Sequence, residues 1–365
     1  MKTVNSLKVA IVCDWLTGIG GAEQVVLELH KMFPKAPIYT SAYDPKKIDW
    51  FKNANVQTTW VNKFPNKFKK FLPVLRAISF SSLNLNDYDL VISSSGAEAK
   101  AIKTKDSTIH INYCHSPTHY YWQRYNSYLE NPGFGKLDWL ARLGLKILVG
   151  PMRRWDLKAA QRPDYIITNS NFTKSEILKY YKRESTVIHP PVNTEYYSKF
   201  KSKSRSGYVI AGRQTPYKRF DLAVAACTKL NLNLNVIGNG PDNKKLKSIA
   251  GPTINFLGQV SDEIKADNLA KAEAFIFPGI DDFGIAAVES LATGTPLIAY
   301  KAGGALDYVN TKTGNFFENQ TVNDVCSVLN DFKKDSFDHK YIIEYSKQYS
   351  IDSFKVNISK FIAAL

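Results

Sequence analysis

The amino-acid sequence contains no apolar run long enough to cross a membrane. A spanning helix needs ~20 apolar residues, and the apolar run near the start, residues 9–13, has only the length of a strand. The first six residues are polar and too few for a secretory signal peptide, so we expect none. Both absences favour a protein that is soluble or attached only to a membrane surface.

Cysteine is also scarce, with four residues in a chain of 365 and no CxxC pair. Widely spaced single cysteines predict neither a disulfide framework nor a zinc site. Reduced thiols are typical of a cytoplasmic enzyme, which is the interpretation we favour. The four are Cys13, Cys114, Cys227 and Cys326.

Acidic residues are outnumbered, with 33 Asp and Glu against 48 Lys and Arg and a net charge of +15. This excess favours anionic partners such as nucleic acid, phosphorylated metabolites or an anionic membrane. No recognisable nucleic-acid-binding module accompanies the charge, so nucleic acid is a remote alternative. With 44% hydrophobic residues, the chain is long enough for two domains with cores of their own.

Short apolar runs alternate with helical patterns along the whole chain, which is typical of parallel α/β sheets. The pattern starts again after Ser206, and the proline-containing segment 189–193 is a stiff candidate linker. The sequence therefore predicts two domains, residues 1–190 and 191–345. The spacing of apolar residues in a C-terminal helix at 346–365 allows it to cross back to the first domain. We expect strands at residues 7–13, 88–93, 109–113, 164–169, 207–211, 234–237, 255–257, 274–277 and 296–299.

Two stretches, residues 50–86 and 134–162, combine basic residues with apolar residues at helical spacing, and in the first these lie mainly near 60–80. Such segments are typical of proteins that bind an anionic membrane surface. A solvated basic face over an ordinary core is the alternative. The basic residues of the first stretch are Lys52, Lys63, Lys67, Lys69, Lys70 and Arg76, and the apolar side of the second consists of Leu137, Leu140, Leu143, Ile147 and Leu148.

Two glycine-containing loops follow predicted strands. In DWLTGIGGAE, residues 14–23, the backbone of Gly20 and Gly21 can approach a diphosphate at the start of a helix. The loop departs from the dinucleotide fingerprint G-x-G-x-x-G, because Glu23 occupies the position of the last glycine. Gly238 and Gly240 offer a further close approach to phosphate or nucleoside, and an ordinary turn is the alternative at both loops.

Charged residues gather after strands of the predicted second domain. Arg213 and Lys218 share the loop after its first strand, where α/β proteins bind ligands, and can neutralise a diphosphate. Further along, Asp281 precedes a predicted helix that contains Glu289, and carboxylates suit the hydroxyls of a sugar or ribose. The backbone amides at the start of that helix suit a phosphate or sugar. They belong to Phe283, Gly284 and Ile285.

A histidine, His115, ends a predicted strand of the first domain within NYCHSPTHYYW, residues 112–122. At a strand end its side chain can contact a donor sugar or support charge at the reacting centre. A purely structural role is the alternative.

Together these motifs resemble the retaining glycosyltransferases of family 4, and the resemblance covers nearly the whole chain in the family's order. GGAE, HSP followed by YYW, GR-x4-K and DDFGIAAVESLATGTP carry it. The resemblance implies the GT-B fold, an α/β architecture of two facing Rossmann-like domains with a cleft between them. The first acid of the pair is usually Glu in the family, whereas this chain has Asp281.

The resemblance also implies a role for each matching residue, divided between the donor and the space around it. The implied contacts are Arg213 and Lys218 with the donor diphosphate, Glu289 with the ribose, Asp281 with donor-sugar hydroxyls, His115 with the transferred sugar, and Gly20 and Gly21 with the diphosphate and acceptor space.

The family implies sugar transfer with retained configuration and no metal or other cofactor. The DFGI and NYCHSP segments most resemble bacterial mannosyltransferases of surface-polysaccharide assembly. We therefore expect GDP-mannose as donor and a lipid-linked saccharide as acceptor, at the inner face of the membrane. A UDP-sugar donor, a sugar-nucleotide epimerase of the same fold and, remotely, a nucleic-acid-binding protein are the alternatives.

Overall fold

The computed structural model describes residues 7–64, 73–130, 132, 135–202 and 204–365. The chain divides into two compact units, unit 1 with residues 1–190 and 355–365 and unit 2 with residues 191–354. Their boundary lies between Pro190 and Pro191, inside the expected linker. Unit 2 continues to Phe354, beyond the expected end at residue 345.

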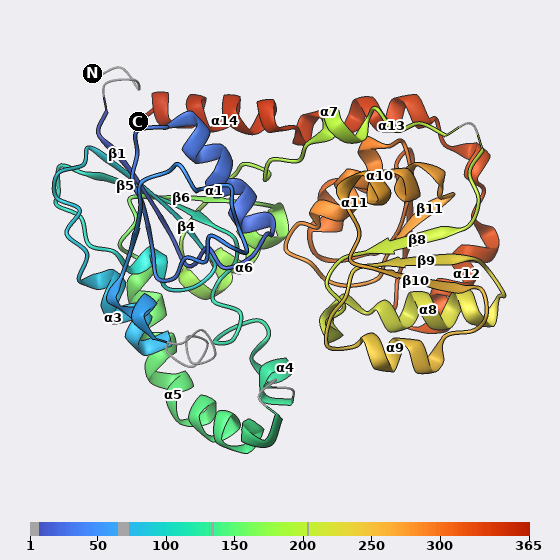
Figure 1. The fold of residues 1–365 in the computed structure, drawn as a ribbon, viewed down its shortest axis with the longest axis horizontal. Helices are drawn as coiled ribbons and strands as arrows, with labels where there is room; N and C mark the ends of the chain where they lie inside the picture. Colours follow the sequence, from blue (N-terminus) through green and yellow to red (C-terminus); the bar gives the residue numbers. More distant parts are fainter. Residues whose placement is uncertain (1–6, 65–72, 131, 133–134, 203) are drawn as a thin grey trace. The chain divides into compact units, whose positions relative to one another are not determined.

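Unit 1 is built on a sheet of seven described strands whose neighbours all run parallel (Figure 1). The central strands are almost entirely buried, and β1 is apolar throughout, whereas β4 and β5 also contain polar residues. The polar Ser93 is accommodated there because its hydroxyl lies 2.8 Å from His110 Nε2. The order is β3 (Val56–Thr58), β2 (Ile38–Thr40), β1 (Val9–Cys13), β4 (Leu90–Ser95), β5 (Ile109–Cys114), β6 (Tyr165–Thr168) and β7 (Thr186–Val187). Among the described residues, the α-helices that belong wholly to this unit are α1 (Gly21–Met32), α3 (Pro73–Ser81), α4 (Tyr125–Glu130), α5 (Asp138–Ala159) and α6 (Asn171–Tyr181).

Unit 2 has a six-stranded parallel sheet with helices on both faces (Figure 1). Alternate residues of β11 enter different cores: Phe275 packs in one cluster and Ile276 in the other. The order is β10 (Ile254–Gly258), β9 (Leu234–Ile237), β8 (Tyr208–Ala211), β11 (Ala274–Phe277), β12 (Leu297–Tyr300) and β13 (Gly314–Phe317). The helices are α7 (Thr194–Tyr197), α8 (Phe220–Lys229), α9 (Asn243–Ile249), α10 (Asp262–Lys271), α11 (Ile285–Ala292), α12 (Val322–Asp331) and α13 (His339–Ser346).

Within the range 346–365, where a C-terminal helix is expected, a short 3-10 turn at Lys347–Tyr349 precedes one α-helix. After α13, the helix α14 (Ile351–Ala363) begins with a cap in which the Ser353 amide donates to the Ser350 hydroxyl. From Lys355 onward the chain belongs to unit 1, and the Lys355 ammonium lies 3.1 Å from the buried carboxylate of Glu28. The ion pair fastens the end of the chain to α1.

One prediction for the first basic stretch is wrong. Arg76, expected on a membrane-binding basic face, is buried, and its Nε lies 2.9 Å from Glu98 Oε2. The Glu98 carboxylate neutralises it inside unit 1, so it contributes no surface charge. Lys67, Lys69 and Lys70 lie outside the described residues. No helix in the described ranges is both long and apolar enough to span a membrane.

Candidate functional site

The predicted donor residues of unit 2 follow the two neighbouring strands at the centre of its sheet. Strand β8 is flanked by β9 on one side and by β11 on the other, so the strand order reverses at this point. Ligands of open α/β sheets bind beyond the carboxyl ends of strands at such a reversal. The loop after β8 carries Arg213 and Lys218, and the loop after β11 carries Asp281.

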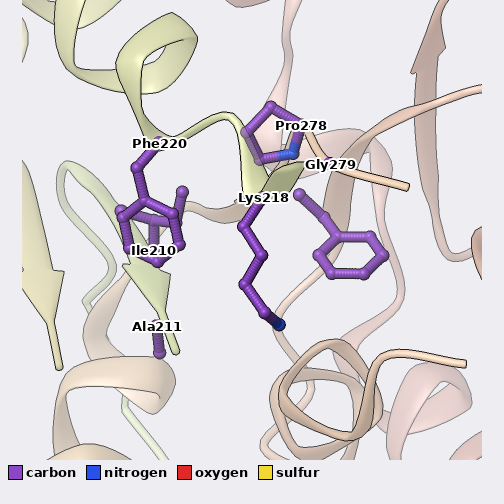
Figure 2. Close-up of a pocket in the computed structure, with 7 residues that line it drawn as sticks. Ile210, Ala211, Lys218, Phe220, Pro278 and Gly279 are labelled. Atoms are coloured by element: carbon purple, nitrogen blue, oxygen red, sulfur yellow. The ribbon is translucent and has the colours of Figure 1, made fainter. Parts of the chain in front are cut away.

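Lys218 and Asp281 meet directly. The lysine Nζ lies 2.6 Å from Asp281 Oδ2, and the two side chains are 21% and 11% exposed. A small cavity of about 10 Å³ lies beside the lysine stem, too small for more than about one water molecule. Figure 2 shows Lys218 among the lining residues, with its nitrogen turned away from Pro278. The family resemblance assigns the two side chains to different parts of a donor, and the structure joins them as an ion pair.

Arg213 differs from Lys218 in being exposed. Among the described residues its guanidinium has no ion pair or side-chain hydrogen bond. Its positive charge is therefore available to an anionic ligand at the end of β8, whereas the charge of Lys218 is already balanced.

Gly238 and Gly240 allow the loops after β8 and β9 to pack backbone against backbone. Gly238 has a φ of +106°, and a Cβ there would overlap the carbonyl oxygen of Gly212. A Cβ on Gly240 would overlap the carbonyl oxygen of Gln214. This packing explains both glycines structurally, and a contact between them and a nucleotide stays a prediction.

Glu289 lies in α11 with two partners that the sequence motifs did not reveal. Its Oε1 accepts a hydrogen bond of 3.0 Å from the Tyr197 hydroxyl, and Lys265 Nζ lies 3.2 Å from both carboxylate oxygens. Burial opposes the charge of Lys265, but the carboxylates of Glu289 and Asp262 outweigh it and raise the pKa of the lysine. Burial, reinforced by Glu289, raises the pKa of Tyr197. These two contacts fix the orientation of the Glu289 side chain.

The start of α11 is fixed by tight packing around Gly284. This residue has a φ of +96°, and a Cβ would lie 2.5 Å from the Phe277 ring and 2.6 Å from the Tyr308 hydroxyl. The same hydroxyl donates a 2.6 Å hydrogen bond to the carbonyl oxygen of Phe283. The backbone of Phe283 and Gly284, leading into Ile285, is therefore rigidly placed where the helix begins.

In unit 1, His115 directly follows β5 and is half-buried. Its Nε2 lies 2.8 Å from the Ser94 hydroxyl, and its carbonyl oxygen accepts a hydrogen bond from Asn169. A Cβ on Gly96 would lie 3.8 Å from the His115 Cβ, so the histidine adjoins the loop after β4. These contacts orient the imidazole at the carboxyl edge of the sheet.

The glycine loop lies at the same edge, because Asp14 ties it to the loop after β4. The Asp14 carboxylate accepts hydrogen bonds from the amides of Gly96, Ala97 and Ala99. Burial, reinforced by the charge of Glu98, raises the Asp14 pKa to about 6, although the amides oppose the shift. His115 and the loop that leads to Gly20 therefore both adjoin the loop after β4.

Gly20 and Gly21 begin α1, with Gly20 as the N-cap residue in extended backbone. The Glu23 carboxylate folds back over Gly20, where a Cβ would lie 2.9 Å from Glu23 Oε2. Burial raises the Glu23 pKa to about 7. An acid that is partly protonated near neutral pH thus adjoins the glycines, a feature that the sequence motif alone did not indicate.

A buried polar network around Asp156 explains Trp122, the last residue of the YYW part of the histidine motif. Asp156 accepts hydrogen bonds from Trp122 Nε1 at 2.7 Å and from the Tyr181 hydroxyl at 2.8 Å. The fully buried Lys100 lies 2.7 Å from the same carboxylate, and Thr118 donates to it. These contacts fix the segment that follows His115 against α5 and α6.

Comparisons with known proteins agree with this arrangement. The family described as "Glycosyltransferase Family 4" matches residues 19–196, and the family described as "Glycosyl transferases group 1" matches residues 193–349. The chain belongs to the family 4 glycosyltransferases. The motifs predicted from sequence are distributed over both matched regions.

Relatives of this glycosyltransferase include several mannosyltransferases. The chain is 23% identical to the alpha-1,3/1,6-mannosyltransferase ALG2 of Dictyostelium discoideum, over 97% of this chain and 96% of the relative. It is 32% identical to a GDP-mannose-dependent alpha-mannosyltransferase of Mycolicibacterium smegmatis, over 27% of this chain and 26% of the relative.

Solved structures show the same GT-B fold. HepE of Anabaena, solved in complex with UDP and glucose, has a TM-score of 0.71 and 16% identity over 98% of this chain and all of HepE. The sucrose-phosphate synthase of Thermosynechococcus elongatus has a TM-score of 0.69 and 16% identity, over 98% of each chain. The prediction of an α/β protein with two Rossmann-like domains is confirmed.

Proposed function

We propose that this glycosyltransferase transfers a hexosyl group from a nucleotide-diphosphate sugar to a lipid-linked saccharide. Mannose is the hexose that we favour. The observation that supports the proposal most is the pairing of Lys218 with Asp281 at the sheet reversal, in which Lys218 shares its loop with the exposed Arg213. The mannosyltransferases among the relatives favour a mannosyl donor. A lipid-linked acceptor is confined to a membrane, and we propose that the reaction takes place at its inner face.

In the proposed reaction the bond between the anomeric carbon and the β-phosphate oxygen breaks, and the nucleoside diphosphate leaves with the electron pair. An acceptor hydroxyl attacks from the same face, so the configuration is retained, and its proton passes to the leaving phosphate. Arg213, Lys218 and the amides at the start of α11 stabilise the developing negative charge. We assign the ribose to Glu289, sugar hydroxyls to Asp281 and the reacting sugar to His115, without a metal ion.

The test is a panel of GDP-mannose, UDP-glucose, UDP-N-acetylglucosamine, UDP-galactose and ADP-glucose, with nucleoside diphosphate release measured with and without a membrane lipid extract. We expect release from GDP-mannose, stimulated by the extract and lost in Glu289→Ala. Glu318→Ala removes an exposed carboxylate elsewhere in unit 2 and should retain activity.

Product analysis separates the alternatives. A glycosylated lipid with the anomeric configuration of the donor supports the proposal, whereas an isomerised sugar nucleotide would indicate an epimerase. Release from a UDP-sugar alone would overturn the donor assignment. If no donor is cleaved and no nucleotide raises the Tm, the proposed activity is wrong.

A further inference from the structure

The helix α5 has buried residues only in its second half, whereas in its first half Arg142 donates hydrogen bonds to carbonyl oxygens at the end of α4. Its buried residues are Met152, Asp156 and Ala159, and none of residues 138–151, all of which are described, is buried. Pro151 lies at the boundary between the two halves. Figure 1 shows the first half of α5 apart from the sheet of its unit. Almost four turns of helix therefore contribute no side chain to the core.

The exposed half carries large apolar side chains where a solvated helix would carry polar ones. Trp139, Leu143 and Ile147 are 63%, 48% and 65% exposed and form one row, since residues four apart lie on the same helix face. Leu140 and Leu148 beside the row are 51% and 44% exposed. A contiguous apolar row of this kind marks an interaction surface. The apolar side predicted from sequence, which consists of Leu137, Leu140, Leu143, Ile147 and Leu148, is thus exposed.

Toward the second half of α5 the same row becomes basic. At helical spacing, the residues that continue this row after Ile147 are Gly150, Arg154 and Lys158, and both basic residues are exposed. The acidic residues of the helix are Asp138 at its start and Asp156, which is buried against Lys100. The outward face therefore offers apolar groups at one end and uncompensated positive charge at the other.

We infer that the outward face of α5 binds an anionic lipid bilayer, with Trp139, Leu143 and Ile147 entering the interface and Arg154 and Lys158 facing lipid phosphates. Apolar residues with tryptophan beside cations are the composition of helices that lie in a membrane interface. The charge at Arg154 and Lys158 selects an anionic surface over a neutral one. The inference rests on the proposed function, because an enzyme that uses a lipid-linked acceptor must bind that acceptor at a membrane.

The experiment measures flotation of the full chain with two kinds of vesicle at about physiological ionic strength. One kind contains phosphatidylcholine alone, and the other contains phosphatidylcholine with about 30% phosphatidylglycerol. We expect binding to the anionic vesicles, reduced more than about tenfold in the triple variant Trp139→Ser, Leu143→Ser, Ile147→Ser. Arg154→Gln with Lys158→Gln should weaken binding by about fivefold per charge. The matched control replaces Leu178, Ile249 and Val356 by Ser, which are 49%, 39% and 49% exposed on other helices, and should bind like the parent.

Equal flotation of the parent and the triple variant, or no flotation of either, would overturn the inference. So would a dimer in sedimentation that the triple variant converts to a monomer without any vesicle binding, because the face would then join two copies. Nucleoside diphosphate binding, followed by thermal shift without vesicles, reports on the proposed function separately. Vesicle binding without donor cleavage would contradict the activity alone.

Discussion

The ammonium of Lys218 lies 2.6 Å from the carboxylate of Asp281, 63 positions further along the chain. The cation proposed to hold a diphosphate is therefore already neutralised by a carboxylate of its own unit. An anionic ligand and Asp281 compete for the same ammonium group. A donor can approach Lys218 only if its phosphates replace this pairing or share it.

This competition predicts opposite effects of Asp281→Asn on product binding and on turnover. We expect the variant to bind GDP several-fold more tightly, since releasing a part-exposed lysine from its ion pair is worth roughly 1 kcal/mol. Turnover should fall, because the proposed contact with sugar hydroxyls is weakened. Calorimetric titration with GDP and steady-state kinetics measure the two effects. Asp282→Asn removes a neighbouring charge, and equal tightening in that control would contradict a specific role for the ion pair.

Alanine at Lys218 or Arg213 should lower kcat more than it weakens donor binding. If both cations act mainly on the charge that develops as the diphosphate leaves, their loss raises the barrier by about 3 kcal/mol, or roughly 100-fold in rate. The measurement is kcat and KM for the donor identified in the panel. Lys312→Ala removes an exposed lysine that lies over the Tyr341 ring, and comparable losses there would contradict the assignment.

Lys265→Met should weaken nucleotide binding without affecting binding of pyrophosphate. The lysine holds Glu289, the proposed ribose ligand, so its loss should release that carboxylate and reduce affinity for GDP by about tenfold. Competition of GDP and of pyrophosphate with a labelled nucleotide separates the two. Lys271→Met, on the same helix and paired with Asp267, is the matched control. Equal loss of pyrophosphate binding would mean that Lys265 contacts phosphate itself.

Gly238→Ala should destabilise unit 2 by more than ~3 kcal/mol, because its methyl group would collide with the backbone of the neighbouring loop. Gly258→Ala separates strain from collision, since Gly258 also has positive φ, +69°, but no atom within 4 Å of an added Cβ. We expect that variant to cost about 1 kcal/mol. Urea unfolding followed by far-UV circular dichroism measures both, since the six tryptophans of the chain all lie in unit 1. Equal destabilisation of the two variants would show that backbone strain alone explains Gly238.

Acid should destabilise unit 1 through His110. Burial, with the charge of Arg162 adding to it, lowers the His110 pKa to about 3 in the folded chain, against an ordinary value near 6.5. The unfolded chain therefore binds the proton more readily between these values, and stability decreases as pH falls from about 6.5 toward 3. His110→Gln should make the decline in the free energy of unfolding shallower by a few kcal/mol over that range. Parallel pH profiles for variant and parent would refute the prediction.

Much of the fold could be predicted from local patterns in the sequence. The buried strand β1 is a continuous apolar run and β4 begins with one at residues 90–92, and Pro190 and Pro191 mark the unit boundary because prolines restrict the backbone around them. Strands β2, β3 and β7 were missed because they have three residues or fewer, and β13 was missed because its four residues begin with Gly314 and Asn315. Such short segments carry too little periodicity to distinguish them from loops.

By itself the sequence determined the parallel α/β architecture, the family and the loops on which the candidate residues lie, because these depend on spacing within short segments. Only the tertiary structure decided which side chains meet. The pairing of Lys218 with Asp281 and the hold of Lys265 on Glu289 join segments that no local pattern relates. The structure likewise decided that Arg76 is buried while Trp139 faces outward. Helical spacing fixes which residues share a face, but packing against the rest of the chain decides whether that face is covered.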